Sequence, residues 1–283
     1  MAYGMAREIV FYSPEDNAIS PYLSELRWEI KPAYLVGGSF LWDAGRKGRY
    51  TLTLQGALPL ASGQMQDFDW MYTNRSDFTH WSLHDITIKT AFVGDVSGDW
   101  PVFSRQGWQI TLGTGYHVDW WSWDDAVRAV RHAPFTSPQT YEPGDPLIPA
   151  TSVPQPGQDG IHYRVLYNVL YGSLGVSYDR QPVRAQLRFI IGPVLAWAHD
   201  HHFRRGHYYD TAFGAPWLGG DFTLDVALGK TLSLVLGFDG AWMPEIKGIT
   251  RYFTESGTYR GYSKSAGFQF WRIKGDVGLR IAF

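Results

Sequence analysis

The last eight residues of the chain show the pattern that decides the fold. They read Asp276-Val277-Gly278-Leu279-Arg280-Ile281-Ala282-Phe283. Large apolar side chains alternate with polar or small ones up to the final residue. Because successive side chains of a strand point to opposite faces, all the large apolar residues of this segment share one face. The segment is therefore predicted to be a β-strand with one apolar and one polar face.

The same period of two recurs along the chain. It is clear in residues 50–55, 86–89 and 108–112, and in 184–189, where two arginines lie on the polar face. Such alternation predicts half-buried strands. Ten strands are predicted in this way, over residues 4–14, 22–31, 49–60, 84–95, 105–123, 161–178, 183–198, 217–228, 231–243 and 268–283.

The composition fits a barrel that faces lipid on one side and water on the other. Aromatic residues make up 16% of the chain and charged residues 18%, whereas average soluble domains carry about 25% charged residues. The 31 glycines and many Ser, Thr and Gln residues dilute the apolar ones. Strands with an outward apolar face and a polar inner face have this balance. A large soluble all-β domain is the alternative that composition leaves open.

Several classes of protein are excluded or disfavoured. The net charge of −2 gives no global field that would recruit nucleic acid. The absence of cysteine excludes disulfide scaffolds, cysteine nucleophiles and thiolate metal sites. The sequence contains no run of about 18 apolar residues, so no transmembrane helix is predicted. Gly-x-Ser-x-Gly, Gly-x-Gly-x-x-Gly, the phosphate-binding loop and His-Glu-x-x-His are absent, which disfavours a serine-hydrolase elbow, nucleotide chemistry and zincin chemistry.

The connections between the predicted strands alternate in length. Short turns at 179–182 and 229–230 alternate with long segments, a typical asymmetry of outer-membrane barrels. The stretch 134–157 holds seven of the 16 prolines and is interpreted as one extended loop. We predict one domain over residues 1–283, a ten-stranded antiparallel transmembrane β-barrel. Its extracellular loops are expected at about 15–21, 61–83, 124–160, 199–216 and 244–267.

Both ends of the sequence bear on export. The final strand ends in Phe283, and terminal strands of this kind resemble the assembly signal of bacterial outer-membrane barrels. Residues 1–11 lack the basic and apolar regions of a secretory signal. We therefore expect the sequence to be that of a mature form behind a start methionine.

Two carboxylates lie at the start of the first long loop. Asp67 and Asp69 are two residues apart, so in an extended chain they point the same way. Because like charges repel, one of the two tends to keep its proton at a higher pH than a free aspartate, which is useful for acid–base catalysis. The alternative is a surface loop with two solvated aspartates.

A second polar motif lies at residues 199–202. Asp200 and His202 have the same spacing, and a carboxylate beside an imidazole fixes its tautomer and raises its basicity. The three histidines also raise the question of a metal ion. Since neighbouring strand residues point to opposite faces, at most two could share one ion without other ligands, and no metal site is predicted. A polar loop without chemistry remains the alternative.

Together these motifs resemble the omptins, a family of Gram-negative outer-membrane endoproteases built on a ten-stranded barrel. The most specific match is the Asp-x-Asp-Trp-Met pattern, followed by a loop of Thr, Ser and His. The Asp-x-His pattern comes later, and the matches keep the family's order along the chain. The matching segments are residues 7–11, 23–29, 63–71, 78–84, 200–202 and 240–242, and the closing strand.

The resemblance implies a role for each matched position. Asp200 orients His202, and His202 with Asp67 opposite holds and deprotonates a water molecule that attacks the scissile carbonyl. Asp69 completes the acidic pair, and Glu8 matches one of two acids that line the substrate pocket. No covalent intermediate and no cofactor are implied. The expectation is a monomeric surface endopeptidase that acts on polypeptides, with its site facing the exterior of a Gram-negative-type outer membrane.

Two departures from the family pattern change this expectation. Ala198 stands where the second pocket acid is expected, so our hypothesis is a broader or single-basic preference rather than a dibasic one. Only Tyr116 matches the family's lipopolysaccharide-binding pattern, so dependence on lipopolysaccharide is expected to be weak or absent. The aromatic run 120–123 is interpreted as a girdle at the membrane interface. Alternative functions are an adhesin or binding platform that has lost catalysis, and a small-solute channel.

Overall fold

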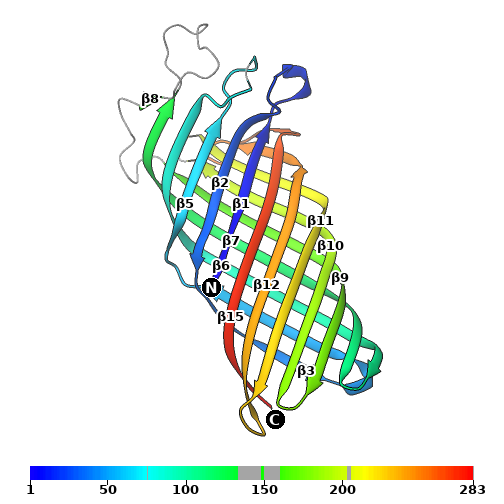
Figure 1. The fold of residues 1–283 in the computed structure, drawn as a ribbon. Helices are drawn as coiled ribbons and strands as arrows, with labels where there is room; N and C mark the ends of the chain where they lie inside the picture. Colours follow the sequence, from blue (N-terminus) through cyan, green and yellow to red (C-terminus); the bar gives the residue numbers. More distant parts are fainter. Residues whose placement is uncertain (75, 133–147, 150–159, 203–204, 283) are drawn as a thin grey trace.

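The fold is almost entirely antiparallel β-structure (Figure 1). The computed structural model describes residues 1–74, 76–132, 148–149, 160–202 and 205–282. Two short 3-10 helices, η1 (Pro14–Asp16) and η2 (Gly45–Lys47), are its helical elements in that part of the chain, and neither has the length or apolar character to cross a membrane. The strands are β1 (Ala2–Phe11), β2 (Tyr22–Ala33), β3 (Leu35–Asp43), β4 (Arg49–Ala57), β5 (Ala61–Asp69), β6 (His80–Arg105), β7 (Trp108–His132), β8 (Ile148–Pro149), β9 (Ile161–Arg180), β10 (Val183–His202), β11 (Gly206–Ala227), β12 (Leu232–Lys247), β13 (Ile249–Phe253), β14 (Tyr259–Ser263) and β15 (Ala266–Ile281).

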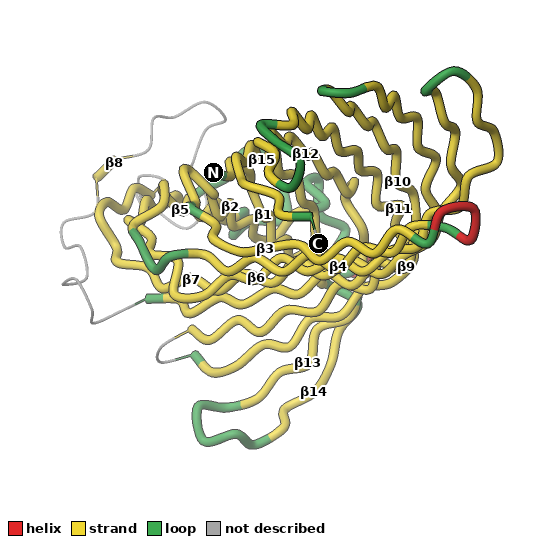
Figure 2. The backbone as a smooth tube through the Cα atoms, turned by 90° about the horizontal axis from the view of Figure 1, so that it is seen from below, coloured by secondary structure: helices red, strands yellow, loops and turns green. Residues whose placement is uncertain are grey.

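The strands form a ring. Its order is β1, β2, β5, β6, β7, β9, β10, β11, β12 and β15, and β15 pairs with β1. The hairpin of β3 and β4 continues β2 and β5 toward one end of the ring, while β13 and β14 extend the other end as a hairpin of their own (Figure 2). The prediction of a ten-stranded antiparallel barrel is confirmed.

The strands are longer than predicted, and the predicted loops are correspondingly shorter. Most of the predicted loop 61–83 lies in β5 and β6, and of the described residues in 199–216 all but Arg205 lie in β10 and β11. Much of the predicted loop 244–267 is strand. The helix η1 overlaps the start of the predicted loop 15–21. The predicted loop 124–160 begins with the end of β7, and most of its remainder is outside the described residues.

The predicted boundaries were wrong because the alternation weakens where strands leave the membrane. β6 has 26 residues and β7 has 25, whereas about 9–11 residues of a tilted strand cross a bilayer. Beyond the bilayer both faces can carry polar side chains, so the period of two fades although the backbone ladder continues. The strand β3 was missed for a local reason, since Gly37, Gly38 and Ser39 interrupt its apolar pattern.

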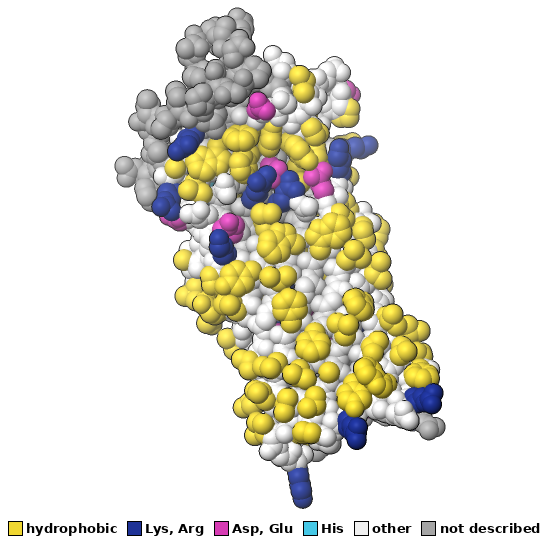
Figure 3. All heavy atoms as spheres, in the orientation of Figure 1, with side chains coloured by type: hydrophobic (Ala, Val, Ile, Leu, Met, Phe, Trp, Pro, Cys, Tyr) yellow, Lys and Arg dark blue, Asp and Glu magenta, His cyan; other side chains and the backbone are white. Residues whose placement is uncertain are grey.

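A belt of exposed apolar side chains marks the membrane-spanning part. On the face shown in Figure 3, apolar side chains cover the lower part, and charged side chains gather higher up, toward the end with the long connections. Most of the exposed large apolar residues fall within 34–60, 96–116, 170–195, 213–242 and 271–281. The pair of Asp67 and Asp69 and the pair of Asp200 and His202 both lie outside these segments.

Aromatic side chains fill the interior between this belt and the motifs. The Trp28 ring stacks on Tyr163 with centroids 5.1 Å apart, and on Trp123 at 5.8 Å. Trp121 and Trp123 are fully buried and point inward. The interpretation of residues 120–123 as an interface girdle is therefore wrong for these two tryptophans. The sequence did not reveal which face of β7 turns inward, and the aromatic layer instead forms an apolar floor beneath the polar motifs.

Ion pairs occupy the interior at the level of the membrane. Arg188 Nε lies 2.7 Å from Asp221, and Asp239 contacts both Arg272 at 3.0 Å and Lys274 at 2.8 Å. Such pairing is how a narrow barrel satisfies inward polar groups. In the described part of the chain, this packing argues against an open solute channel.

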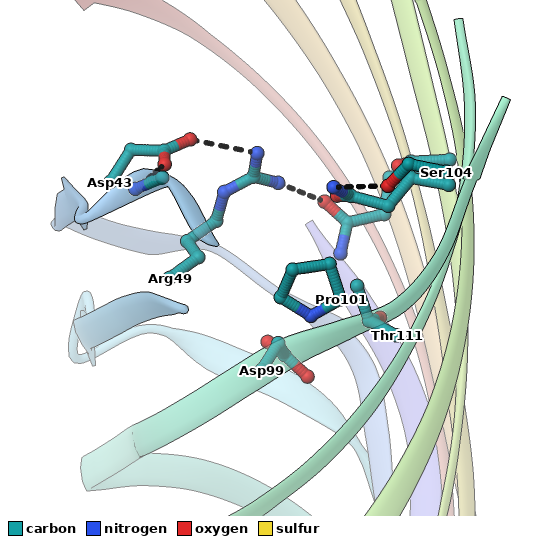
Figure 4. A pocket seen from close by; sticks show the side chains of 10 residues that line it. Asp43, Arg49, Asp99, Pro101, Ser104 and Thr111 are labelled. Atoms are coloured by element: carbon teal, nitrogen blue, oxygen red, sulfur yellow. Dashed lines mark hydrogen bonds and ion pairs between the residues drawn. The ribbon is translucent and has the colours of Figure 1, made fainter. Parts of the chain in front are cut away.

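A small polar cavity lies near the turn between β3 and β4, at the end away from the motifs. It has a volume of about 270 Å³. Arg49 projects into it and contacts Asp43 at 3.0 Å and Gln186 at 3.3 Å (Figure 4). Because the cavity and the motifs are at opposite ends of the barrel, we assign it no part in the chemistry described next.

Candidate active site

Two carboxylates project from the inner face of β5. Asp67 and Asp69 lie beside β2, where the Ser24 hydroxyl donates a hydrogen bond to Asp67 Oδ1 at 3.3 Å. Burial raises the pKa of Asp67 well above its usual range, and the charge of Asp69 raises it further. Burial also raises the pKa of Asp69, against the hydrogen bond from Ser24. The pair therefore retains a proton at pH values where a solvated aspartate is ionised.

A carboxylate and an imidazole are in contact on the inner face of β10. Asp200 Oδ2 lies 2.6 Å from His202 Nε2, and Asp200 is almost fully buried. Burial lowers the pKa of His202, but the charge and hydrogen bond of Asp200 outweigh it, so the pKa is raised overall. Since Nε2 is engaged by Asp200, Nδ1 is the ring nitrogen left to take a proton from a substrate or from water.

The two motifs act on each other across the mouth of the barrel. β5 and β10 belong to different walls, separated by β6, β7 and β9. The charge of Asp67 nevertheless raises the pKa of His202, and the charge of His202 lowers that of Asp67. Arg205, at the β10–β11 turn, lowers the pKa of both groups. The acid pair and the Asp–His pair thus face a common space.

Two further acids lie beside Asp200. Glu8 on β1 and Asp210 on β11 are each only 2% exposed. Burial raises the pKa of Glu8 well above its usual range, and the charges of Asp200 and Asp210 add to this. Burial likewise raises the pKa of Asp210 to about 7, although a hydrogen bond from Thr250 opposes the shift. Among the described residues, Glu8 Oε2 and Asp210 Oδ1 have no hydrogen-bond partner, so both can accept a donor from a bound molecule.

Asp210 provides a carboxylate next to Ala198, the position at which the family resemblance implies an acid. It pairs directly with Ala198 in the ladder between β10 and β11. Directly opposed residues share a face and have Cβ atoms about 4.5–5.5 Å apart. A carboxylate from the neighbouring strand therefore occupies the region next to Ala198. Asp210 was not predicted, because no local sequence pattern reveals the strand register that brings the two residues together.

A chain of contacts from serine to histidine to aspartate lies next to Asp67. Ser82 is the ladder partner of Asp67 on β6. Its hydroxyl lies 2.7 Å from His84 Nε2, and His84 Nδ1 contacts Asp125. The order of atoms matches that of serine-hydrolase triads. A serine nucleophile was disfavoured from the sequence because Gly-x-Ser-x-Gly is absent, and the contact of His84 with Asp125 on β7 could not be seen there.

All five side chains that the sequence analysis selected face the space at the barrel mouth, and none points toward the lipid-facing surface. They are Glu8, Asp67, Asp69, Asp200 and His202. Arg205, Asp210 and Ser82 complete the site and were not selected. The arrangement offers a base, a protonated acid pair and buried carboxylates around one space, a combination suited to hydrolysis of a neutral bond beside a cationic group.

Comparisons with known proteins agree with this architecture. The model of the omptin family matches residues 1–283. The plasminogen activator of Yersinia pestis is 29% identical over 126 residues, which are 44% of this chain and 38% of that protein. The match therefore spans well under half of that relative's length. The crystal structure of the outer membrane protease OmpT from Escherichia coli aligns with a TM-score of 0.84 at 19% identity, covering 100% of this chain and 93% of that chain.

Proposed function

The chain belongs to the omptin family, and we propose that it is an endopeptidase that hydrolyses peptide bonds at the outer mouth of an outer-membrane barrel. The observation that carries the proposal is the pairing of Asp200 with His202 at 2.6 Å, facing Asp67 on another wall. Polypeptides are the proposed partners, since the site opens at the end with the long connections.

The proposed reaction needs no covalent intermediate. A water molecule held between Asp67 and His202 attacks the scissile carbonyl carbon, and His202 Nδ1 takes its proton. Asp200 keeps the imidazole in the productive tautomer and stabilises the imidazolium. The proton held by Asp67 and Asp69 is donated to the carbonyl oxygen as it becomes negative. The imidazolium then protonates the leaving nitrogen as the carbon–nitrogen bond breaks, and the carboxyl group that forms returns one proton to Asp67 and Asp69.

We propose a preference for Lys or Arg beside the cleaved bond. Glu8 and Asp210 present buried carboxylate oxygens next to the catalytic pair. A buried carboxylate that carries charge is stabilised by a cation, and the cation in turn lowers the pKa of the acid. Asp210 thus supplies the second acidic charge that Ala198 does not.

Replacement of Asp210 by asparagine tests this preference. Asp210→Asn should lower kcat/KM for peptides with Arg or Lys beside the scissile bond by roughly 30-fold or more, because a buried charge pair that loses one partner costs about 2–5 kcal/mol. Peptides with a neutral residue there should change only a few-fold. In the wild type, the preference for basic residues should weaken as the pH falls below about 7, because Asp210 gains a proton; the variant should lose this contribution of Asp210 to the pH dependence.

Fluorogenic peptides that differ only at that position provide the measurement. Glu15→Gln, which removes an exposed acid on η1, is the matched control and should behave as the wild type. An equal loss for basic and neutral peptides in Asp210→Asn would remove Asp210 from the specificity pocket. The endopeptidase proposal would stand in that case, since it rests on hydrolysis itself.

Ser82 is expected to position neighbouring groups rather than to attack the substrate. Ser82→Ala should lower kcat/KM only about 2- to 10-fold, the effect of one lost hydrogen bond of about 0.5–1.5 kcal/mol. Incubation with a fluorophosphonate should leave both activity and intact mass unchanged. A covalent adduct on Ser82 with loss of activity would assign the nucleophile to Ser82 and contradict direct attack by water.

We also propose that hydrolysis does not require lipopolysaccharide. Tyr116 donates a hydrogen bond to Asn168 at 2.5 Å, and Val118 and Trp120, two and four residues further on the same face of β7, are apolar. Neither side chain carries a positive charge that could form an ion pair with a lipid phosphate. The detergent-refolded protein should therefore cleave a basic peptide at similar rates with and without added lipopolysaccharide; strict dependence would overturn this proposal.

The second candidate is a non-catalytic barrel that serves as an adhesin or binding platform. Ala198, at a position where the resemblance implies an acid, is the observation that favours it. The same peptide panel separates the two candidates. If no basic, acidic or neutral peptide is cleaved, with or without lipopolysaccharide, the binding platform becomes the better account.

A further inference from the structure

The outer face of the β10–β11 hairpin carries a cluster of histidines. Because side chains alternate along a strand, His199 and His201 point away from Asp200 and His202. His207 on β11 is the ladder partner of His201. Glu255 reaches the same place from the turn between β13 and β14. Three separate elements thus bring nitrogen and carboxylate ligands to one point on the outer wall.

The ligand atoms are close to one another. His201 Nε2 lies 2.9 Å from Glu255 Oε1 and 3.1 Å from Oε2. One ligand atom from each of His201, His207 and Glu255 lies within 4.8 Å of the others. The rings of His201 and His207 stack with centroids 4.1 Å apart.

We propose that His201, His207 and Glu255 bind a divalent transition-metal ion of the zinc class. Zinc forms bonds of about 2.0–2.2 Å to imidazole nitrogen and carboxylate oxygen, so its tetrahedral ligands are roughly 3.3 Å apart. The present separations need only small movements, and Glu255 is an exposed turn residue that can make them. Two imidazoles and one carboxylate suit zinc, copper or nickel, whereas calcium and magnesium prefer oxygen ligands.

His199 would orient one of the ligands. Its Nε2 lies 3.1 Å from His207 Nδ1. At this distance His199 Nε2 can accept a hydrogen bond from His207 Nδ1. This leaves His207 Nε2 for the ion, the arrangement that a second hydrogen bond commonly imposes on a metal-bound histidine.

The ion would link two parts of the barrel rim. His201 and His207 belong to the β10–β11 hairpin, and Glu255 to the β13–β14 hairpin. Gly206 begins β11 with φ of 119°, and an added Cβ there would lie 2.3 Å from the Phe253 carbonyl oxygen. The two hairpins therefore already approach closely. Because Asp200 and His202 flank His201 on β10, a bound ion would restrain the backbone that carries them.

The expectation of no metal site, drawn from the sequence, is thereby replaced by a proposal. From the sequence, at most two residues of 199–202 were expected to share an ion without other ligands. His207 and Glu255 are those other ligands, and only the strand register and the turn reveal them. Metal binding by these three side chains does not require peptidase activity.

Metal titration of the refolded, metal-stripped protein tests the site. Isothermal calorimetry with Zn²⁺ should detect one saturable site, and Co²⁺ should give the visible absorption bands of tetrahedral coordination. A variant with both His201→Ala and His207→Ala should bind at least about 100-fold more weakly. His199→Ala should weaken binding about 10- to 100-fold, as expected when a group that orients a ligand is lost. Glu15→Gln, which removes an exposed acid on η1, is the control and should bind as the wild type.

Glu255→Gln keeps the test decisive if the double variant does not fold. Glu255 is exposed in a turn, so replacing its carboxylate with the amide of glutamine should leave the barrel intact. Zn²⁺ should raise the thermal midpoint of the wild type, because a ligand that binds the folded state stabilises it, and this rise should shrink in Glu255→Gln. Equal Zn²⁺ binding in the wild type and the double variant, or no saturable binding by the wild type, would overturn the proposal.

Discussion

His202→Ala should lower kcat/KM for a peptide containing a basic residue by at least about 10³-fold. A general base that takes a proton in the transition state contributes about 10²- to 10⁴-fold to the rate, and His202 is the imidazole held by Asp200 at the barrel mouth. The loss should appear mainly in kcat, since His202 acts on water rather than on the peptide side chains. Fluorogenic peptides at saturating concentration provide the measurement.

The matched control for this loss is His162→Ala, which alters a histidine on the outer wall. Both variants should retain the barrel's resistance to unfolding in detergent, because neither side chain belongs to the aromatic layer or to the interior ion pairs. If His202→Ala retains activity within about 10-fold of the wild type, His202 is not the base.

Asp200→Asn should cost on the order of 10⁴-fold in kcat, because an amide leaves the imidazole in the wrong tautomer. It should also move the pH profile. In the wild type Asp200 outweighs burial and raises the pKa of His202, so activity is lost as the pH falls through that raised value. Without the charge the pKa of His202 drops, and the acidic limb should shift to lower pH.

The pH profile separates positioning from simple structural damage. A variant that only disturbs packing loses rate at all pH values and keeps the position of the acidic limb. A profile of kcat/KM against pH for Asp200→Asn with an unmoved limb would therefore argue against the Asp200–His202 pairing in the active enzyme.

The sequence predicted the barrel because alternation is a local signal. Strands that face lipid must keep one apolar face, so segments such as 50–55 and 184–189 can be recognised as strands from their alternation. Above the membrane this constraint ends. That is why the upper parts of β10 and β11, which carry the site, were predicted as a loop. Inward and outward faces of the aromatic run 120–123 were equally invisible, because tryptophan suits both an interface girdle and a buried layer.

The site was predictable where it consists of short motifs. Asp67 with Asp69, and Asp200 with His202, each lie two residues apart and therefore share a face of their strand. What depends on contacts between strands was not predictable. Asp210 beside Ala198 requires the β10–β11 register, and the histidine and glutamate cluster requires that register and a turn. Such pairings follow from the packing of the whole ring rather than from any one segment.

Asp67 and His202 are proposed to act on the same water molecule, and a double-mutant cycle measures whether they do. We would measure kcat for Asp67→Asn, His202→Ala and the combined variant on one peptide. Residues that serve one step as a unit are strongly non-additive. The combined variant should therefore be no more than a few-fold slower than the slower single variant. Losses that multiply would show that the two side chains work independently and do not share one water molecule.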